Sequence, residues 1–331
     1  MIGTQRSGSN LLRVMLNQLP ELIAPHPPHI INVFAPLVKF YGNLNNPENF
    51  KILVNDVCTL IERNPVQWNL NFDRKEIASA CKKNSLISLF IALHNYKASQ
   101  NAKATWCCKS LEAVNHLHLF TEAGFNPFII YLYRDGRDVA CSFKRVLIGE
   151  KHIYHLAVKW AEEQERALSY IQRLSEEEYT IFNYRKLLDN PQGVVKEICD
   201  KTGLRYSDAI LDYYKSEEAQ NTSLAGSMWN NLVKPVIKNN TNKFPKELSR
   251  EEIEIFERVA GRTLMKLGYE LVTNPVSTSF SSQEIAFFDS ENVRLKKLAY
   301  ENADPADIEH RKAYDDYISE LKQRLKAFPL K

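Results

Sequence analysis

Two apolar segments, at residues 128–133 and 179–184, interrupt the helical patterns of this chain. A continuous apolar run of this length is typical of a strand that is buried on both faces of a parallel sheet. Because helical patterns precede and follow each run, strands and helices alternate along the sequence. We therefore expect an α/β fold with a central, mainly parallel sheet flanked by helices.

Apolar residues recur at helical spacing in most of the remaining chain. The helices expected from this periodicity cover residues 11–19, 53–62, 84–96, 111–123, 138–148, 155–174, 191–202, 250–267 and 309–328, with a short strand at 105–109. Residues 221–246 have few periodic apolar positions and many Asn, Lys and Ser, which favours a loop. We expect a Ser/Thr-rich linker at residues 276–283.

The composition is that of an ordinary globular protein. Hydrophobic residues make up 44% of the 331 positions and charged residues 25%, which excludes a disordered chain. A formal net charge of +3 is too close to balance to indicate bulk nucleic-acid binding. No apolar run reaches the ~18 residues that a membrane span needs. The polar segment that begins at Arg6 is unlike a signal peptide.

The six cysteines show no C-x-x-C pair, and two of them, Cys107 and Cys108, are adjacent. This arrangement fits neither a disulfide framework nor a zinc site, so no metal site is expected. Small, mostly buried thiols of this kind are typical of a reduced compartment, and we predict a cytoplasmic protein.

A first candidate binding site lies at residues 3–10, Gly-Thr-Gln-Arg-Ser-Gly-Ser-Asn, between a short strand and a helix. The backbone N–H groups of such a loop and of a helix N-terminus point toward a bound anion. Gly3 and Gly8 have the spacing of the ATP-binding loop G-x-x-x-x-G-K-[ST]. However, Ser9-Asn10 replaces the Lys and the hydroxyl that holds magnesium. Arg6 supplies the positive charge instead, so magnesium triphosphate is a poor fit.

A second candidate site follows the apolar run at 128–133, where Arg134-Asp135-Gly136-Arg137 leads into the next helix. An Arg at the carboxyl end of a buried parallel strand occupies the place where open α/β sheets bind ligands. Ser142 lies about two helical turns further along, so its hydroxyl can reach the same ligand. Two anion sites in one chain indicate a ligand with phosphates at both ends.

Together these segments resemble the signature of sulfotransferases that use 3′-phosphoadenylyl sulfate (PAPS), most closely the tyrosylprotein and bacterial-type branch. In that family an R-S-G-[ST] loop binds the 5′-phosphosulfate, and here the loop reads Arg6-Ser7-Gly8-Ser9, followed by Asn10. The family's R-D-x-R-x-x-x-x-S segment binds the 3′-phosphate, and here it runs from Arg134 to Ser142. The resemblance extends over most of residues 1–270.

Three weaker segments match the same family in the same order. Residues 106–110 resemble the strand whose Lys, here Lys109, contacts the donor. Tyr184 resembles the strand-end Tyr near the adenine. Residues 234–244 resemble the basic loop that closes over the donor, with Lys243 and Ser227 as its candidate contacts. The candidate cations for the leaving bisphosphate are then Arg6, Lys109 and Lys243.

The expected general base departs from the branch that the chain resembles. Tyrosylprotein sulfotransferases use a Glu shortly after the first helix, whereas residues 24–30, Ala-Pro-His-Pro-Pro-His-Ile, hold no carboxylate. Imidazole, with an unperturbed pKa near 6.5, is the usual general base of enzymes. The predicted base is therefore His26 or His29, with a slight preference for His29 that no sequence feature decides.

The resemblance implies a sulfotransferase that moves the sulfuryl group of PAPS to a hydroxyl or amine of a small molecule or glycan, by in-line transfer. It assigns residues 1–275 to the α/β domain, with a helical acceptor-side insertion at 30–104. Residues 276–331 become a linker and a helix that either packs on the domain or joins a homodimer. We expect the acceptor pocket to draw on residues 30–104 and on this C-terminal segment. Two alternatives stay open: a catalytically inactive nucleotide-binding relative, and a magnesium-dependent P-loop kinase.

Overall fold

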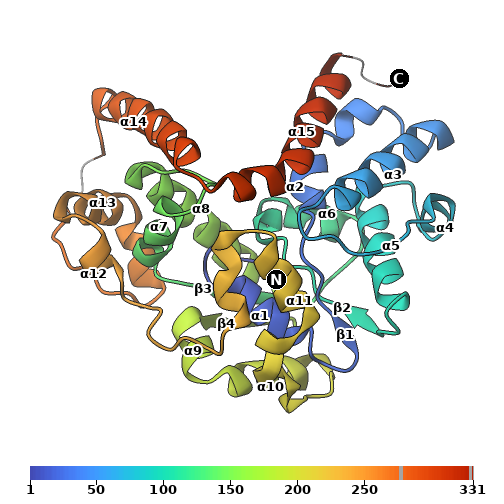
Figure 1. The fold of residues 1–331 in the computed structure, drawn as a ribbon, viewed down its shortest axis with the longest axis horizontal. Helices are drawn as coiled ribbons and strands as arrows, with labels where there is room; N and C mark the ends of the chain where they lie inside the picture. Colours follow the sequence, from blue (N-terminus) through green and yellow to red (C-terminus); the bar gives the residue numbers. More distant parts are fainter. Residues whose placement is uncertain (276–278, 328–329, 331) are drawn as a thin grey trace.

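The computed structural model describes residues 1–275, 279–327 and 330 (Figure 1). The described residues contain two parallel strand pairs: β1 (Leu22–Ile23) with β2 (Thr105–Trp106), and β3 (Ile129–Tyr133) with β4 (Tyr179–Asn183). Ile2 adds one parallel bridge to Tyr131. The predicted α/β fold with parallel pairing is confirmed, although it is mostly helical and its sheets are small.

Most of the described chain is helical. The α-helices are α1 (Ser9–Leu16), α2 (Ile30–Phe34), α3 (Pro47–Glu62), α4 (Arg74–Ser79), α5 (Leu86–Ser99), α6 (Leu117–Glu122), α7 (Gly136–Lys144), α8 (Ile153–Ile171), α9 (Tyr184–Asp189), α10 (Pro191–Thr202), α11 (Glu217–Leu224), α12 (Phe244–Glu247), α13 (Arg250–Lys266), α14 (Ser282–Glu301) and α15 (Pro305–Ala327). The 3₁₀ helices are η1 (Val38–Tyr41), η2 (Leu111–His116), η3 (Asp208–Lys215) and η4 (Ser227–Val233).

Two predicted loops are only partly right. The segment 221–246 contains the end of α11, η4 and the start of α12, with non-helical chain between them. These elements are too short to show a long apolar period, and α11 begins at a Ser216 cap rather than with an apolar repeat. The predicted linker 276–283 overlaps the start of α14, and its residues 276–278 lie outside the described residues. Helix α14 has no apolar period in its sequence, because it buries only Phe288 and Asn292.

Two predicted elements are only partly right. The strand expected at residues 105–109 is limited to β2, and the helix expected at 111–123 begins as the 3₁₀ helix η2. The expected helix 309–328 begins earlier, at Pro305, and Phe328 lies outside the described residues.

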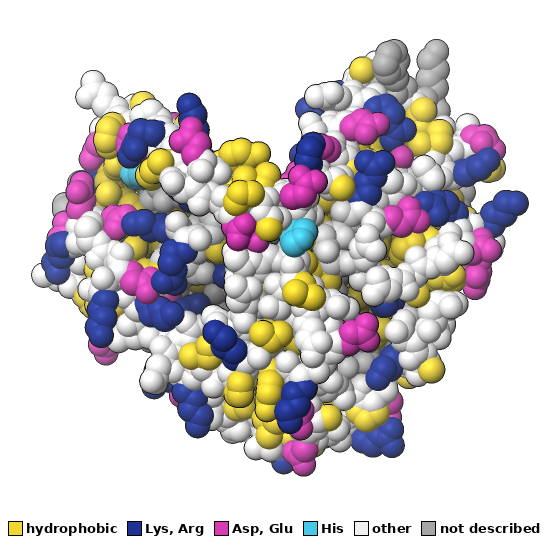
Figure 2. All heavy atoms as spheres, in the orientation of Figure 1, with side chains coloured by type: hydrophobic (Ala, Val, Ile, Leu, Met, Phe, Trp, Pro, Cys, Tyr) yellow, Lys and Arg dark blue, Asp and Glu magenta, His cyan; other side chains and the backbone are white. Residues whose placement is uncertain are grey.

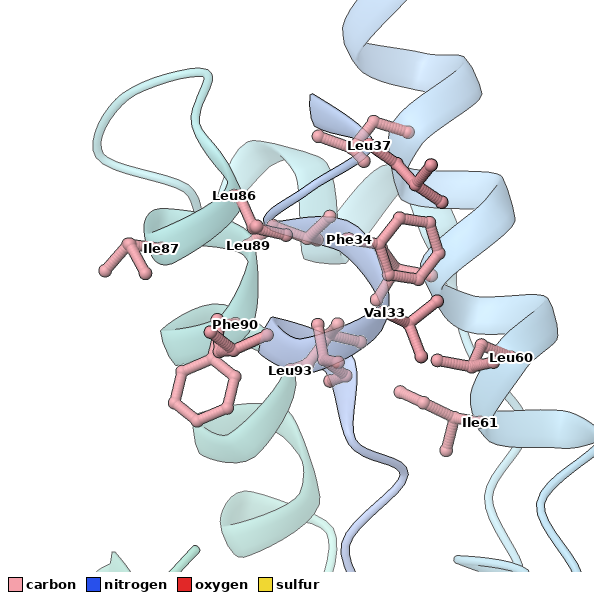
Figure 3. Packing of buried hydrophobic residues seen from close by; sticks show 14 of the residues in the cluster. Val33, Phe34, Leu37, Leu60, Ile61, Leu86, Ile87, Leu89, Phe90 and Leu93 are labelled. Carbon is pink, nitrogen blue, oxygen red and sulfur yellow. The ribbon is translucent and has the colours of Figure 1, made fainter. Parts of the chain in front are cut away.

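The helices of residues 30–104 supply most of one hydrophobic core, to which β3, α8 and α15 also contribute. Figure 3 shows α2, with Val33 and Phe34, between Leu60 and Ile61 of α3 and Leu93 of α5. These side chains belong to one buried cluster, and Phe34 and Leu93 are fully buried. This packing holds the start of α2, and therefore residues 26–29 before it, in a fixed place.

The C-terminal helices spread across one edge of the molecule. In Figure 1, α14 lies beside α8, and α15 runs from the centre toward α3. Figure 2 shows the surface notched between the outer ends of these two helices. Helix α15 buries the apolar stripe of Tyr314, Leu321 and Leu325. It therefore packs on the domain, which was one of the two arrangements expected for it. Within the described residues, no helix combines the length and hydropathy that a bilayer crossing requires.

Candidate active site

The loop between Ile2 and α1 is shaped by two glycines. Gly3 has a φ of 134°, and a Cβ there would lie 2.3 Å from the Leu132 carbonyl oxygen. Gly8 has a φ of 88°, and its Cβ would meet the Tyr184 ring at 2.3 Å. Both positions therefore require glycine. Between them Arg6 has a φ of 69°, a left-handed conformation that costs a non-glycine residue about 1–2 kcal/mol.

This strained backbone directs the Arg6 side chain toward α7. Its Nε donates to Ser142 Oγ at 2.9 Å, and its Nη2 donates to the Met228 carbonyl at 3.3 Å. Burial and the neighbouring charges of Arg134 and Arg145 lower the Arg6 pKa to about 10. Cations that repel one another in a buried place favour the binding of an anion.

Arg134 stands at the carboxyl end of β3, as predicted, and is 6% exposed. Its guanidinium lies 4.7 Å over the Tyr184 ring. It donates to the carbonyls of Arg6 and Asn240 at 3.3 and 2.8 Å, and pairs with Asp138 at 3.2 Å. Its Nε is buried and has no hydrogen-bond partner among the described residues.

Asp138 fixes the loop that carries Lys243. Its carboxylate accepts the backbone N–H groups of Asn242, Lys243 and Phe244, at 2.8, 2.7 and 3.1 Å. Asn240 donates from its amide to the Tyr184 hydroxyl at 2.9 Å. A segment about one hundred residues away in sequence is thereby held against the end of β3.

Arg137, the second Arg of the signature, has a structural role instead. It pairs with Asp135 at 2.8 Å and with Glu257, and it lies 4.0 Å over the Phe244 ring. Because two carboxylates of the protein neutralise it, Arg137 joins α7 to α13, and Arg134 rather than Arg137 lines the cavity described below.

The predicted site residues meet at one cavity of about 770 Å³. Of the predicted residues, Arg6, Gly8, Ser9, Asn10, His26, His29, Lys109, Arg134, Ser142, Tyr184, Ser227 and Lys243 line it. Ser7 does not line it, although its hydroxyl is buried and has no partner among the described residues. No group of three or more His, Cys, Asp or Glu suited to a metal ion occurs in the described part of the chain.

Lys109 is a buried cation in this cavity, only 7% exposed. Burial, together with the charges of Arg13 and Arg6, lowers its pKa to about 7. A lysine with a pKa near 7 is readily protonated when an anion binds beside it. The resulting ammonium group then stabilises the bound anion.

The two candidate bases have different surroundings. His26 is 5% exposed, and its ring lies edge-on to Trp229 with centroids 5.0 Å apart. Burial and the charges of Arg13 and Lys109 lower its pKa well below the usual range. His29 is half-buried and has a φ of 56° at the start of α2. Burial, Lys109 and Arg311 lower its pKa to about 4, and Glu112 opposes them.

Glu112 is a site residue that the sequence reasoning missed. It accepts hydrogen bonds from Gln5 at 3.2 Å, from Lys159 at 2.9 Å, and from Asn32. Burial opposes its charge, but Lys159 outweighs this and lowers the Glu112 pKa. A signal was present in the sequence, because Glu112 follows Lys109 by three residues, after the same strand.

Ser227 lies at the cavity in a different way from the other residues. It is exposed, and both its backbone N–H and its hydroxyl donate to the Asp307 carboxylate at the start of α15. A ligand that recruits this hydroxyl must therefore compete with Asp307.

The family model described as "Sulfotransferase family" matches residues 1–208, well over half of the chain. The chain belongs to the sulfotransferase family. Ser227, Lys243 and the C-terminal helices lie beyond the matched residues of this sulfotransferase.

Two solved structures are similar to this sulfotransferase. A sulfotransferase domain from the curacin biosynthetic pathway has a TM-score of 0.54 and 21% identity, covering 82% of this chain and 96% of its own. A sulfotransferase domain from the Synechococcus PCC 7002 olefin synthase has a TM-score of 0.50 and 19% identity, covering 82% and 94%. At these identities the likeness shows the fold alone. No curated protein matches the sequence significantly.

Proposed function

We propose that this sulfotransferase moves the sulfuryl group of PAPS to a hydroxyl or amine of a small molecule or glycan, with His29 as the general base. The observation that carries the proposal is the direct contact between the two anion-binding segments. Arg6 of the first donates to Ser142 of the second, and Arg134 of the second donates to the Arg6 carbonyl. Because the two anion-binding segments touch, one ligand with phosphate at both ends can contact both of them.

The polar groups of the cavity support PAPS as the donor. Arg134, with its buried and unpartnered Nε, and Ser142 are suited to the 3′-phosphate. The loop before α1, with Arg6, Ser9 and the helix N-terminus at the cavity, is suited to the 5′-phosphosulfate. Tyr184 offers an aromatic surface for the adenine, and Lys243 and Ser227 lie where a loop can close over the donor.

The transfer forms a bond between the acceptor oxygen and sulfur, and it breaks the bond from sulfur to the bridging phosphate oxygen. The electron pair of the broken bond stays on the bisphosphate, so negative charge grows on that oxygen. Fixed cations stabilise such charge when water is excluded. Arg6 and Lys109, both lining the cavity, are assigned this role.

His29 takes the proton of the acceptor as the new bond forms. We prefer it to His26 because His29 is less buried and because Glu112 favours the charged imidazolium that results. Asn32, one turn after His29, donates to Glu112 and keeps the carboxylate on that side of α2. The sulfotransferase domain is assigned to residues 1–275, with residues 30–104 on the acceptor side, and the extension to 276–331.

The experiment is an assay with sulfur-labelled PAPS, run against a panel of phenols, alcohols, amines and sugars in buffer with EDTA. We expect labelled product together with release of adenosine 3′,5′-bisphosphate. Donor binding without transfer to any acceptor would favour the inactive relative instead. Transfer of phosphate from magnesium ATP, lost in EDTA, would favour the kinase.

A further inference from the structure

Helix α15 forms one side of the cavity with a single stripe of side chains. Arg311, Tyr314, Asp315, Ile318 and Lys322 all line the cavity. Their spacing places them on one face of the helix. This stripe lies outside residues 1–208, which the family model matches. The cavity is therefore completed by the C-terminal extension of this chain.

The helix is docked firmly enough to hold that stripe in place. The Tyr314 hydroxyl donates to the Pro28 carbonyl at 3.0 Å, between the two candidate bases. Further along α15, Tyr317 donates to the Asp56 carbonyl at 3.0 Å, and Arg324 pairs with the Asp56 carboxylate at 2.6 Å. Since Leu321 is also buried, the cavity-facing side chains of α15 start from a fixed backbone.

Arg311 brings a positive charge close to the base. Arg311 and His29 line the same cavity, and the charge of Arg311 is among the causes that lower the pKa of His29. The ion-pair partner of Arg311 is Asp315, one turn along α15 at 3.2 Å; the Arg311 side chain is 22% exposed and that of Asp315 is 53% exposed. A helix pair at this spacing with an exposed partner is worth about 0.3–0.5 kcal/mol, so the Arg311 guanidinium can exchange Asp315 for a ligand at little cost.

The donor leaves this charge unused. In the proposed function, Arg6 and Arg134 bind the two ends of the donor from the loop before α1 and the end of β3. Arg311 instead comes from α15, whose Tyr314 contacts Pro28 next to the candidate base His29, the side of the cavity where the accepting hydroxyl must lie. Its charge is therefore available to a second group on the acceptor.

We infer that Arg311 selects acceptors that carry an anionic group, such as a carboxylate, in addition to the hydroxyl that receives the sulfuryl group. The inference rests on the proposed function and adds the chemical class of the acceptor. A charge-assisted hydrogen bond from Arg311 to that group holds the acceptor with its hydroxyl at His29.

The test compares acids with their methyl esters as acceptors, since the pair differs in charge and little in shape. The probes are 4-hydroxyphenylacetate and 6-hydroxyhexanoate, each with its ester, in the presence of saturating PAPS. We expect the wild type to prefer the acid, and Arg311→Ala to raise KM for the acid about 10- to 100-fold while KM for the ester changes little. Lys312→Ala is the matched control, because Lys312 is exposed and pairs with Asp316 on the same helix.

Equal use of acid and ester by the wild type would overturn the inference, and so would an Arg311→Ala variant that keeps the preference for the acid. If turnover is too slow to measure KM, a calorimetric titration of each probe into protein loaded with adenosine 3′,5′-bisphosphate measures its binding instead. If the bisphosphate binds but neither acid binds or reacts better than its ester, the acceptor class is wrong and the donor assignment stands. If the bisphosphate itself does not bind, the proposed function fails.

Discussion

The Arg6 guanidinium donates to the Ser142 hydroxyl at 2.9 Å, across 136 positions of sequence. Arg6 belongs to the loop before α1, and Ser142 belongs to α7, which follows β3. The contact exists because Ile2 and β3 are paired, with Ile2 donating to the Ile130 carbonyl at 2.8 Å. The bridge between Ile2 and β3 therefore brings two separate sequence signatures to one cavity.

In the proposed function, Arg134 makes a charge-assisted contact to the 3′-phosphate, which Arg134→Ala removes. We expect adenosine 3′,5′-bisphosphate to bind more weakly by about 1.5–3 kcal/mol, whereas 5′-AMP, which lacks that phosphate, loses much less. Calorimetry with both nucleotides measures the difference. Arg166→Ala is the control, because Arg166 is a surface residue paired with Glu162. Equal weakening of both nucleotides would show that Arg134 does not read the 3′-phosphate.

His29→Ala should lower kcat about 10²- to 10⁴-fold, the usual contribution of a general base, with little change in bisphosphate affinity. His118→Ala, at an exposed histidine, is the control. In the wild type the base acts when neutral, so kcat/KM should rise with pH through about 4, the pKa of His29. A fully active His29→Ala variant would move the role to His26 or to another group.

Glu112→Gln removes the carboxylate that favours the charged form of His29. The acid limb of the kcat/KM profile should therefore shift to lower pH, and kcat should fall by about one to two orders of magnitude. If Glu112 were only structural, Glu112→Gln would lower the stability of the protein and leave the acid limb of the kcat/KM profile at the same pH. Glu162→Gln, at an exposed glutamate, serves as the comparison.

Lys109→Met should stabilise the protein while it removes turnover. The folded-state pKa of about 7 lies below the ordinary lysine value, so the unfolded chain binds more protons than the folded one between pH 7 and 10. The free energy of unfolding of the wild type therefore rises with pH through this window, because the buried Lys109 no longer has to lose its proton on folding. The variant has no Lys109 and lacks this rise. At pH 7 we expect the variant to be more stable by on the order of 1–4 kcal/mol. Thermal unfolding at pH 7 and pH 9.5 measures it, and a less stable variant at pH 7 contradicts the account.

Gly8→Ala tests the loop itself. The positive φ and the 2.3 Å approach to the Tyr184 ring leave no room for a Cβ. We expect a loss of stability of about 1–2 kcal/mol or more together with weaker bisphosphate binding. Gly203→Ala is a useful comparison, because Gly203 also has a positive φ but no atom within 4 Å of its Cβ position. A Gly8→Ala variant that binds normally would show that the loop is not shaped by this contact.

The sequence predicted those parts of the site that lie in short segments. Arg6 and Arg134 each follow a strand pattern directly, so their local signals place them at the ends of strands. Glu112 could have been found in the same way, because it lies just after β2. What the sequence could not show are the tertiary contacts that hold two of the predicted residues: Asp138 holds the loop of Lys243, and Asp307 holds Ser227.

In the fold, too, local patterns were predictable and tertiary contacts were not. Long amphipathic helices such as α8 and α13 were predictable from their apolar period, because each buries one face. Helix α14 was missed because it buries little and shows no such period. That the C-terminal segment contributes to the acceptor side could be expected from the sequence, but not which residues do so, since Tyr314 of α15 reaches Pro28 across 286 positions of sequence.

The most direct test of the central claim is a calorimetric titration of the wild-type protein with adenosine 3′,5′-bisphosphate, with 5′-AMP and magnesium ATP as comparisons. We predict micromolar binding of the bisphosphate that depends on its 3′-phosphate, and much weaker binding of the other two nucleotides. Tighter binding of magnesium ATP, or equal binding of the bisphosphate and 5′-AMP, would contradict the account.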